Sequence, residues 1–178
     1  KTRAKPQKIA ECLSLCGPSV ERVEKFDRND FVYSDGTNYV YSIEVTTNRV
    51  DSASVLGVAR EAAAILPRFK IPAKFVMTKV SSKVNFVRNV DYLEADVDPL
   101  LCSRFTAILI KNVKMGQSPK VIQNRLRAIG VRPLNNIIDI TNYLMYELGQ
   151  PSHVFDFDKI KGHKMILRQS RKGESITT

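Results

Sequence analysis

The segment from residue 132 to residue 162, RPLNNIIDITNYLMYELGQPSHVFDFDKIKG, constrains the fold of this chain more than any other. Its apolar run is bounded by Asn135-Asn136 before it and by Gly149 and Pro151 after it. Glycine suits the residue that ends a helix, and proline cannot continue one. The pattern therefore predicts a helix over about 136–148. We expect its core face to consist of Ile137, Ile138, Ile140, Leu144, Met145 and Leu148.

Two polar residues, Thr141 and Asn142, interrupt this apolar run. A hydroxyl and a carboxamide can donate and accept hydrogen bonds without adding charge, so they can orient an ester, an amino group or a water. His153 follows in the exit loop, and histidine can bond a ribose hydroxyl or relay a proton near neutral pH. The alternatives are structural. Thr141 and Asn142 would bond to neighbouring backbone groups, and His153 to Asp156 or Asp158.

A helix is also predicted at the start of the chain, over residues 6–16, because Pro6 suits a first helical position and Gly17 suits the exit. Its expected stripe is Ile9, Cys12, Leu13 and Cys16. Packing is the expected role of both cysteines. No further Cys or His cluster follows at the spacing of a metal site, so we expect no metal.

Two more helices have start and stop signals. One is predicted over about 55–66, capped by Ser52 or Ser54. Its expected buried stripe is Leu56, Ala59, Ala63 and Leu66. The other begins at Pro119 after a capping Ser118 and ends at Gly130.

Runs of β-branched and aromatic residues predict strands between these helices. Two of them, 30–34 and 39–45, flank a hairpin turn at 35–38. The others are 74–78, 84–90, 104–113, 164–169 and 175–178. A turn at 171–175 makes the last two a hairpin. Because the chain stops inside that hairpin, we expect it to be a fragment.

Length and composition narrow the class of protein. A chain of 178 residues suggests one domain or two small ones. No apolar run reaches the length of a membrane span and no signal peptide is visible, so we expect no membrane partner. Three cysteines without a secretory signal indicate a reducing, cytoplasmic setting. The net charge of +10 suits a nucleic acid, an acidic protein or an anionic surface, but solvated lysines explain it equally well.

The segment around Thr141, Asn142 and His153 closely resembles the beta subunit of phenylalanyl-tRNA synthetase, in the first half of its editing domain. The matching residues are Arg132-Pro133, Asn135-Asn136, Ile138-Asp139, Thr141-Asn142-Tyr143, Met145, Glu147-Leu148-Gly149-Gln150-Pro151, His153 and Phe155-Asp156. The resemblance extends over nearly the whole chain. Two departures stand out. Val50 replaces a proline frequent in the family, which would leave that loop less rigid, and there is no room for the oligonucleotide-binding insertion of many bacterial members.

The resemblance implies an enzyme of two alpha and two beta subunits that joins phenylalanine to tRNA(Phe) using ATP and Mg²⁺. The aminoacylation site would lie in the alpha subunit, so no cofactor is expected on this chain. The editing domain would hydrolyse tyrosine wrongly attached to tRNA(Phe). By resemblance, Thr141 and Asn142 line the editing pocket, and His153 contacts the terminal ribose or the attacking water.

The predicted fold is α+β, with a small helix-and-hairpin module at 1–66, a linker at 67–98 and the first part of an editing domain at 99–178. Two other functions stay open. The chain could be a non-catalytic structural and tRNA-docking fragment, or it could be a free-standing aminoacyl-tRNA deacylase.

Overall fold

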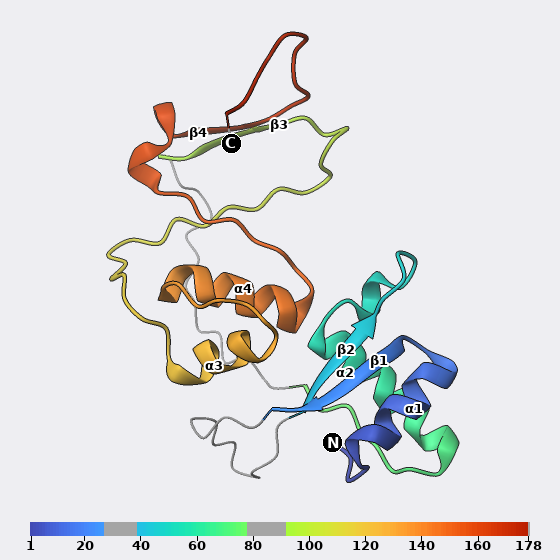
Figure 1. Ribbon diagram of the computed structural model, residues 1–178. Helices are drawn as coiled ribbons and strands as arrows, with labels where there is room; N and C mark the ends of the chain where they lie inside the picture. The colour runs from blue at the N-terminus through green and yellow to red at the C-terminus, as the bar shows by residue number, and fades with distance from the viewer. Residues whose placement is uncertain (27–38, 78–91, 178) are drawn as a thin grey trace. The chain divides into compact units, whose positions relative to one another are not determined.

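The computed structural model describes residues 1–26, 39–77 and 92–177. It forms two compact units, one of Lys1–Lys79 with Met115–Val154 and one of Val80–Lys114 with Phe155–Thr178. Helices and two small two-stranded sheets occur together, which confirms the α+β class (Figure 1). The domain boundaries expected from the sequence stay a prediction. No helix among the described residues is long and apolar enough to span a bilayer.

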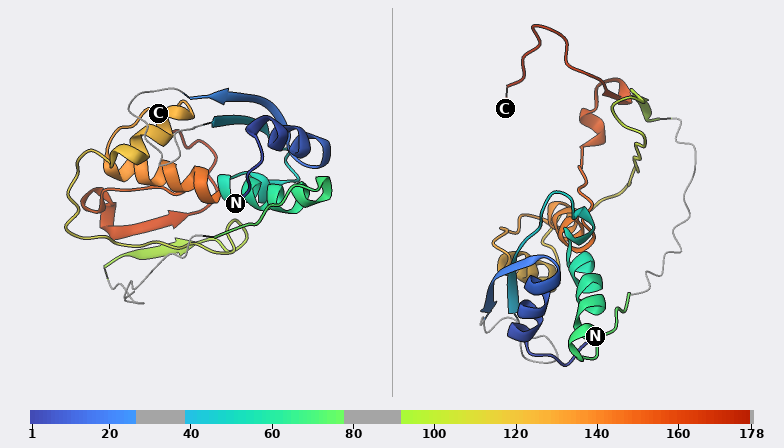
Figure 2. Two further views of the ribbon diagram at one scale, coloured as in Figure 1. Left: turned by 90° about the horizontal axis from the view of Figure 1, so that it is seen from below. Right: turned by 90° about the vertical axis from the view of Figure 1, so that its right-hand side faces the viewer.

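The first unit is built on two neighbouring helices, α1 (Pro6–Cys16) and α2 (Val55–Ile65), which lie side by side in both views of Figure 2. Their predicted bounds are confirmed to within one residue. Pro6 occupies the first turn of α1, and the hydroxyl of Ser54 accepts from the backbone N–H of Gly57 at 2.9 Å as the N-cap of α2. The buried core between the two helices consists of Cys12, Leu13, Ile65 and Leu66.

The predicted buried stripes were wrong at two positions. Cys16 is exposed, because it is the last residue of α1 and Gly17 makes the close approach to α2 in its place. A Cβ on Gly17 would lie 3.0 Å from the Cδ1 of Ile65. Ala59 is exposed as well. The face of α2 that meets the core is instead the one that carries Val58, Ala62 and Ile65.

An antiparallel pair of strands, β1 (Ser19–Lys25) and β2 (Tyr39–Glu44), adjoins α1. The strand predicted at 39–45 is confirmed, whereas its predicted partner at 30–34 and the turn at 35–38 lie outside the described residues. The sequence pattern did not predict β1. The register of β1 shifts between Val20 and Arg22, so its half-buried valines, Val20 and Val23, stand three residues apart instead of two.

Only an isolated bridge forms near the strand predicted at 74–78. Thr2 pairs with Ala73, and the Thr2 hydroxyl donates to the carbonyl of Pro72 at 2.9 Å. Residues 74–77 have no strand structure. The start of the chain is thereby joined to the segment that follows α2. The strand predicted at 84–90 lies outside the described residues.

Two further helices, α3 (Lys120–Ala128) and α4 (Asn136–Leu148), complete this unit and lie side by side (Figure 1). Both end as the sequence predicts, at glycines in the left-handed region: Gly130 with φ +80° and Gly149 with φ +81°. The start of α3 differs from the prediction. Pro119 takes the N-cap position, because the side chain of Ser118 is buried and bonded elsewhere.

The second unit contains a short parallel pair, β3 (Glu94–Val97) and β4 (Lys164–Leu167). The strand predicted at 164–169 is confirmed over the bounds of β4, but the hairpin predicted between it and 175–178 was wrong. Residues 175–177 are not a strand, and β4 pairs with β3 instead. The strand predicted at 104–113 was also wrong. That segment forms no ladder with any described strand, and a β-run needs a hydrogen-bonded neighbour as well as suitable residues.

Candidate functional site

The candidate residues Thr141 and Asn142 are carried by α4, whose first turn is closed by two asparagines. The Oδ1 of Asn135 accepts from the backbone N–H groups of Ile137 at 3.0 Å and Ile138 at 3.1 Å, which is a complete N-cap. Asn136 makes two hydrogen bonds with Gly116. Its backbone N–H donates to the Gly116 carbonyl at 2.8 Å, and its side-chain Oδ1 accepts from the Gly116 N–H at 3.1 Å. The paired asparagines therefore fix the start of α4 against the turn before α3.

The most buried residue of α4 is Asp139, at 1% exposure. Its Oδ1 accepts from the backbone N–H of Leu134 at 2.7 Å, and its Oδ2 accepts a short hydrogen bond from the hydroxyl of Ser118. The amide of Gln123 in turn donates to the Ser118 carbonyl at 2.7 Å. A fully satisfied polar network of this kind specifies one packing of two helices, because leaving any member unpaired costs free energy.

The core face predicted for α4 was wrong at three positions. Three of the apolar residues expected there, Ile140, Leu144 and Leu148, are 41% exposed or more. The helix is rotated so that Asp139 faces α3, since Ser118 and the N–H of Leu134 offer it donors there. In the sequence, Asp139 was identified only as one of the residues that match the family motif, and no structural role was predicted for it. No local signal marked it as buried, because Ser118 followed by Pro119 has the pattern of an ordinary helix start.

Thr141 lies half-buried on α4, and its hydroxyl donates to the carbonyl of Ile138 at 2.9 Å. This is the local side-chain-to-backbone bond that threonine commonly makes within a helix. It matches the structural alternative considered for this residue. The hydroxyl oxygen keeps lone pairs for a second partner. Asn142 is the next residue of the helix and is also half-buried.

His153 lies in the exposed loop that follows Gly149, outside the helix. One of the two carboxylates suggested as its structural partners has another role, because the Oδ1 of Asp156 accepts from the backbone N–H of Asp158 at 3.2 Å. Thr141, Asn142 and His153 all belong to the first compact unit. Two surface hollows among the described residues of that unit are lined by none of the three.

Contacts from α3 and from the region of α2 hold α4 in place along its length. In its middle, a guanidinium N–H of Arg125 donates a short hydrogen bond to the hydroxyl of Tyr143. Burial raises the pKa of that hydroxyl. At its C-terminal end, Gly149 lies so close to the turn before α2 that a Cβ there would stand 3.2 Å from the carbonyl oxygen of Ala53.

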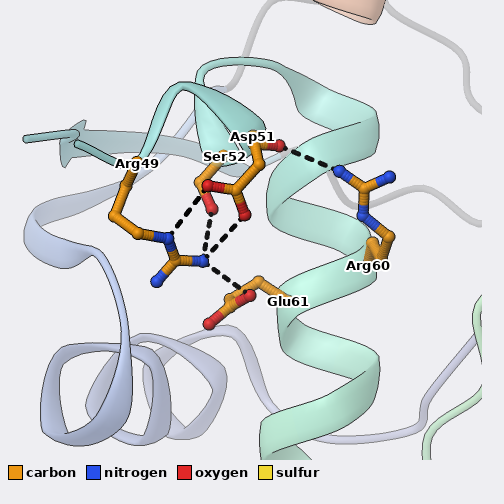
Figure 3. A network of polar contacts seen from close by, with 5 residues as sticks. All are labelled: Arg49, Asp51, Ser52, Arg60 and Glu61. Atoms are coloured by element: carbon orange, nitrogen blue, oxygen red, sulfur yellow. Dashed lines mark hydrogen bonds and ion pairs between the residues drawn. The ribbon is translucent and has the colours of Figure 1, made fainter. Parts of the chain in front are cut away.

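That turn is fastened by Arg49, which Figure 3 shows within a group of polar side chains. The guanidinium donates to both carboxylate oxygens of Asp51 at 3.0 Å and to the hydroxyl of Ser52 at 3.1 Å, and it pairs with Glu61 of α2 at 2.9 Å. The hydrogen bonds from Arg49 hold the pKa of the Asp51 carboxyl below its usual range. They also raise the pKa of Arg49 itself. Sequence reasoning expected a less rigid loop here and did not predict this network.

The opposite side of the same turn is held by Arg60, whose guanidinium donates to the Asp51 carbonyl at 3.1 Å (Figure 3). Across residues 1–26, 39–77 and 92–177, no group of three or more His, Cys, Asp or Glu side chains is arranged to hold a metal ion. The chemistry that the candidate residues can supply is therefore hydrogen bonding by Thr141 and Asn142, and hydrogen bonding or proton transfer by His153.

Two comparisons with known proteins, one with family models and one with individual sequences, show what this chain is similar to. The family model described as the B3/4 domain matches residues 101–178. The chain is 40% identical over 167 residues to the phenylalanine–tRNA ligase beta subunit of Carboxydothermus hydrogenoformans, which is 90% of this chain and 18% of that protein. It is 44% identical to that of Clostridium acetobutylicum, over 79% of this chain and 17% of that protein.

A third relative, the phenylalanine–tRNA ligase beta subunit of Moorella thermoacetica, is 43% identical over 78% of this chain and 17% of its own length. These similarities confirm the resemblance inferred from the sequence. The chain spans less than a fifth of the length of the curated relatives that it matches.

Proposed function

We propose that this chain is part of a phenylalanine–tRNA ligase beta subunit and that it contributes to hydrolytic editing of Tyr-tRNA(Phe). The observation that carries the proposal is the 40% identity to such a subunit over 90% of the chain. The whole enzyme would be cytoplasmic, would pair this subunit with an alpha subunit, and would use ATP and Mg²⁺ at a site outside this chain. The B3/4 match over residues 101–178 supports assigning that part to editing.

The need for editing follows from the chemistry of the two amino acids. Tyrosine differs from phenylalanine by one hydroxyl, and an apolar synthetic pocket rejects an added hydroxyl poorly. A second pocket that hydrogen-bonds the tyrosine hydroxyl would reject phenylalanine strongly, because phenylalanine would leave buried polar groups unpaired at a cost of roughly 1–3 kcal/mol each. Neutral polar side chains such as Thr141 and Asn142 suit the lining of such a pocket.

In this proposal Thr141 and Asn142 bind the aminoacyl end of the substrate, and His153 contacts the terminal ribose or the attacking water. The residues would position a water and need form no covalent intermediate. The fixed ends of α4 support this role, since the Asn135 cap and the Gly149 contact hold the helix that carries Thr141 and Asn142. Pre-positioned hydrogen-bonding groups contribute most when they need no rearrangement.

The test is hydrolysis of Tyr-tRNA(Phe) by the 178-residue chain and by an intact subunit that contains it, with Phe-tRNA(Phe) as the control substrate. We expect Asn142→Ala and His153→Ala in the intact subunit to slow hydrolysis of the tyrosyl ester by roughly 10- to 1000-fold. His163→Ala is the matched control, because His163 stacks on Phe157 in the other compact unit, with ring centroids 4.3 Å apart.

Each outcome has a distinct meaning. Unchanged rates in both Asn142→Ala and His153→Ala would refute the assignment of the site. Activity in the isolated chain would indicate that it acts as a deacylase by itself. Activity in the intact subunit alone would mean that residues outside this chain complete the pocket.

A further inference from the structure

A hollow of about 300 Å³ lies beside the C-terminal end of α3 in the first unit. It is lined by Phe26, which follows β1, by Arg127 of α3, and by the turn between α3 and α4. The turn contributes Gly130, Val131, Arg132 and Pro133. The candidate editing residues do not line this hollow, so a ligand here would make a separate contact.

The guanidinium of Arg127 is held in a defined orientation at this hollow. Its two terminal nitrogens donate to the amide oxygens of Gln123 at 2.9 Å and Asn124 at 3.1 Å. Gln123 is itself 6% exposed and anchored to the Ser118 carbonyl. Both partners of Arg127 are neutral, so neither cancels its charge. A guanidinium has five donors, and several remain for a ligand.

The two charged residues that line the hollow, Arg127 and Arg132, are both basic. Residues 115–138, which belong to the same unit, contain no Asp or Glu but four basic residues: Lys120, Arg125, Arg127 and Arg132. Other arginines of the chain, such as Arg49 and Arg168, form ion pairs with carboxylates. Among the described residues, no carboxylate forms an ion pair with Arg127 or Arg132.

One structural explanation accounts for part of this charge. Cations in the last turn of a helix interact favourably with its carbonyl end, and Arg127 is in the last turn of α3. The helix end carries only about half a negative charge. Its carbonyls are also satisfied by the backbone, since Gly130 donates to Arg127 and Val131 donates to Leu126. Arg132, beyond the helix, is not explained in this way.

We propose that this hollow binds a single-stranded segment of RNA. Arg127 and Arg132 would contact backbone phosphates, because a planar guanidinium matches two phosphate oxygens at once. The half-buried Phe26 and the ring of Pro133 would form apolar walls for a sugar or an unpaired base. The choice of RNA as the ligand rests on the proposed function. The location and the two arginines are taken from the lining of this hollow alone.

The experiment measures binding of a fluorescein-labelled 12-nucleotide oligouridylate to the 178-residue chain by anisotropy, at several salt concentrations. The variants are Arg127→Gln, Arg132→Gln and the double variant. Arg22→Gln is the matched control, because it removes the same charge from the same unit but from β1, where Arg22 pairs with Glu24 at 3.2 Å.

Each phosphate contact with a single strand contributes about 0.7 to the slope of log affinity against log salt. At about 0.1 M salt, relative to about 1 M where this contribution vanishes, a slope of about 0.7 corresponds to roughly 5-fold in affinity per contact and roughly 25-fold for two contacts. We expect these losses in the single and double variants, and less than about 2-fold in Arg22→Gln. Arg132→Gln leaves both hydrogen bonds of Arg127 in place, so its loss cannot be attributed to damage to α3.

Three results would overturn the proposal. Equal losses in Arg22→Gln and Arg132→Gln would show that net charge alone drives binding. A duplex RNA that binds more tightly than the single strand, and is weakened as much by the variants, would show recognition of helical shape. Displacement of the RNA by polyglutamate at equal charge would indicate an acidic protein as the partner. The assay contains no ester, so it can succeed or fail independently of Tyr-tRNA(Phe) hydrolysis.

Discussion

Replacing Gly149 with alanine should destabilise this protein more than the same replacement at Gly130. Both glycines end a helix in nearly the same left-handed conformation, with φ +81° and +80°. That conformation costs a residue with a Cβ roughly 1–2 kcal/mol. Alanine also restricts the unfolded chain, which offsets roughly 0.4–1 kcal/mol. Because both contributions apply equally at the two positions, they cancel in the comparison.

The two positions differ in what a new methyl group would meet. At Gly130 the methyl would have no atom of the described residues within 4 Å apart from its own chain neighbours. At Gly149 the methyl would lie 3.2 Å from the Ala53 carbonyl oxygen and 3.3 Å from the Ser54 Cβ. The turn cannot yield easily, since Arg49 and Arg60 both hold it. Overpacking of this kind typically costs about 1–3 kcal/mol, so Gly149→Ala should lose at least about 1 kcal/mol more than Gly130→Ala.

The assay is urea unfolding of both variants and the parent chain, followed by far-UV circular dichroism. Equal slopes against denaturant would confirm that the variants unfold from similar states, and the difference between the fitted free energies gives the cost of the contact. A difference below about 0.3–0.5 kcal/mol, the usual limit of additivity, would refute the argument. It would mean that the end of α4 does not pack tightly on the turn before α2.

Three further predictions concern other parts of the chain. Asp139→Ala should lower the free energy of unfolding in urea by about 2–4 kcal/mol, because it leaves the buried Ser118 hydroxyl and a backbone N–H without an acceptor; a loss under 1 kcal/mol would contradict the network. Ser54→Ala removes the N-cap of α2 and should cost about 1 kcal/mol in the same assay, whereas no change would show that water replaces the cap. Hydrogen bonds from Arg168 and a backbone N–H lower the pKa of Glu174 to about 2 from its ordinary 4.5. Its contribution to stability is therefore full above about pH 4.5 and is lost as the pH falls toward 2. An NMR titration should show that pKa in the parent chain and a return toward 4.5 in Arg168→Gln; a titration near 4.5 in the parent would disprove the pairing.

The helices could be predicted from the sequence because their boundaries depend on neighbouring residues. Pro6 and Gly17 around α1, Ser54 before α2, and Gly149 after α4 all act within one turn of the helix they bound. The strands were harder because each depends on a partner far away in the chain. The run at 104–113 has a strong β-composition but no ladder among the described residues, while β3 is only four residues long and pairs 70 residues away.

For the candidate site, the sequence allowed only the residues of the motif to be predicted, and not the contacts that hold them in place. Thr141, Asn142 and His153 were identified from residue type and resemblance, and their roles stay predictions. The contacts that hold α4 were not predictable, since Asp139 meets Ser118 across 21 residues of sequence and Gly149 meets Ala53 across about a hundred. Such pairs do not change the local pattern of either segment. They become visible only when the two elements are packed together.

The pairing of β3 with β4 has a consequence for synthesis on the ribosome. Glu94 pairs with Lys164, so 70 residues separate the two strands. At about 5–20 residues per second, β3 would emerge roughly 4–14 s before its partner exists. During that interval its edge is open to wrong pairing. Glu94 and Asp96 place negative charges on the waiting strand, which discourages association with other chains until Lys164 arrives to bind them at 2.8 and 3.4 Å. The two carboxylates that form ion pairs in the finished sheet would thus first protect the nascent chain from wrong pairing.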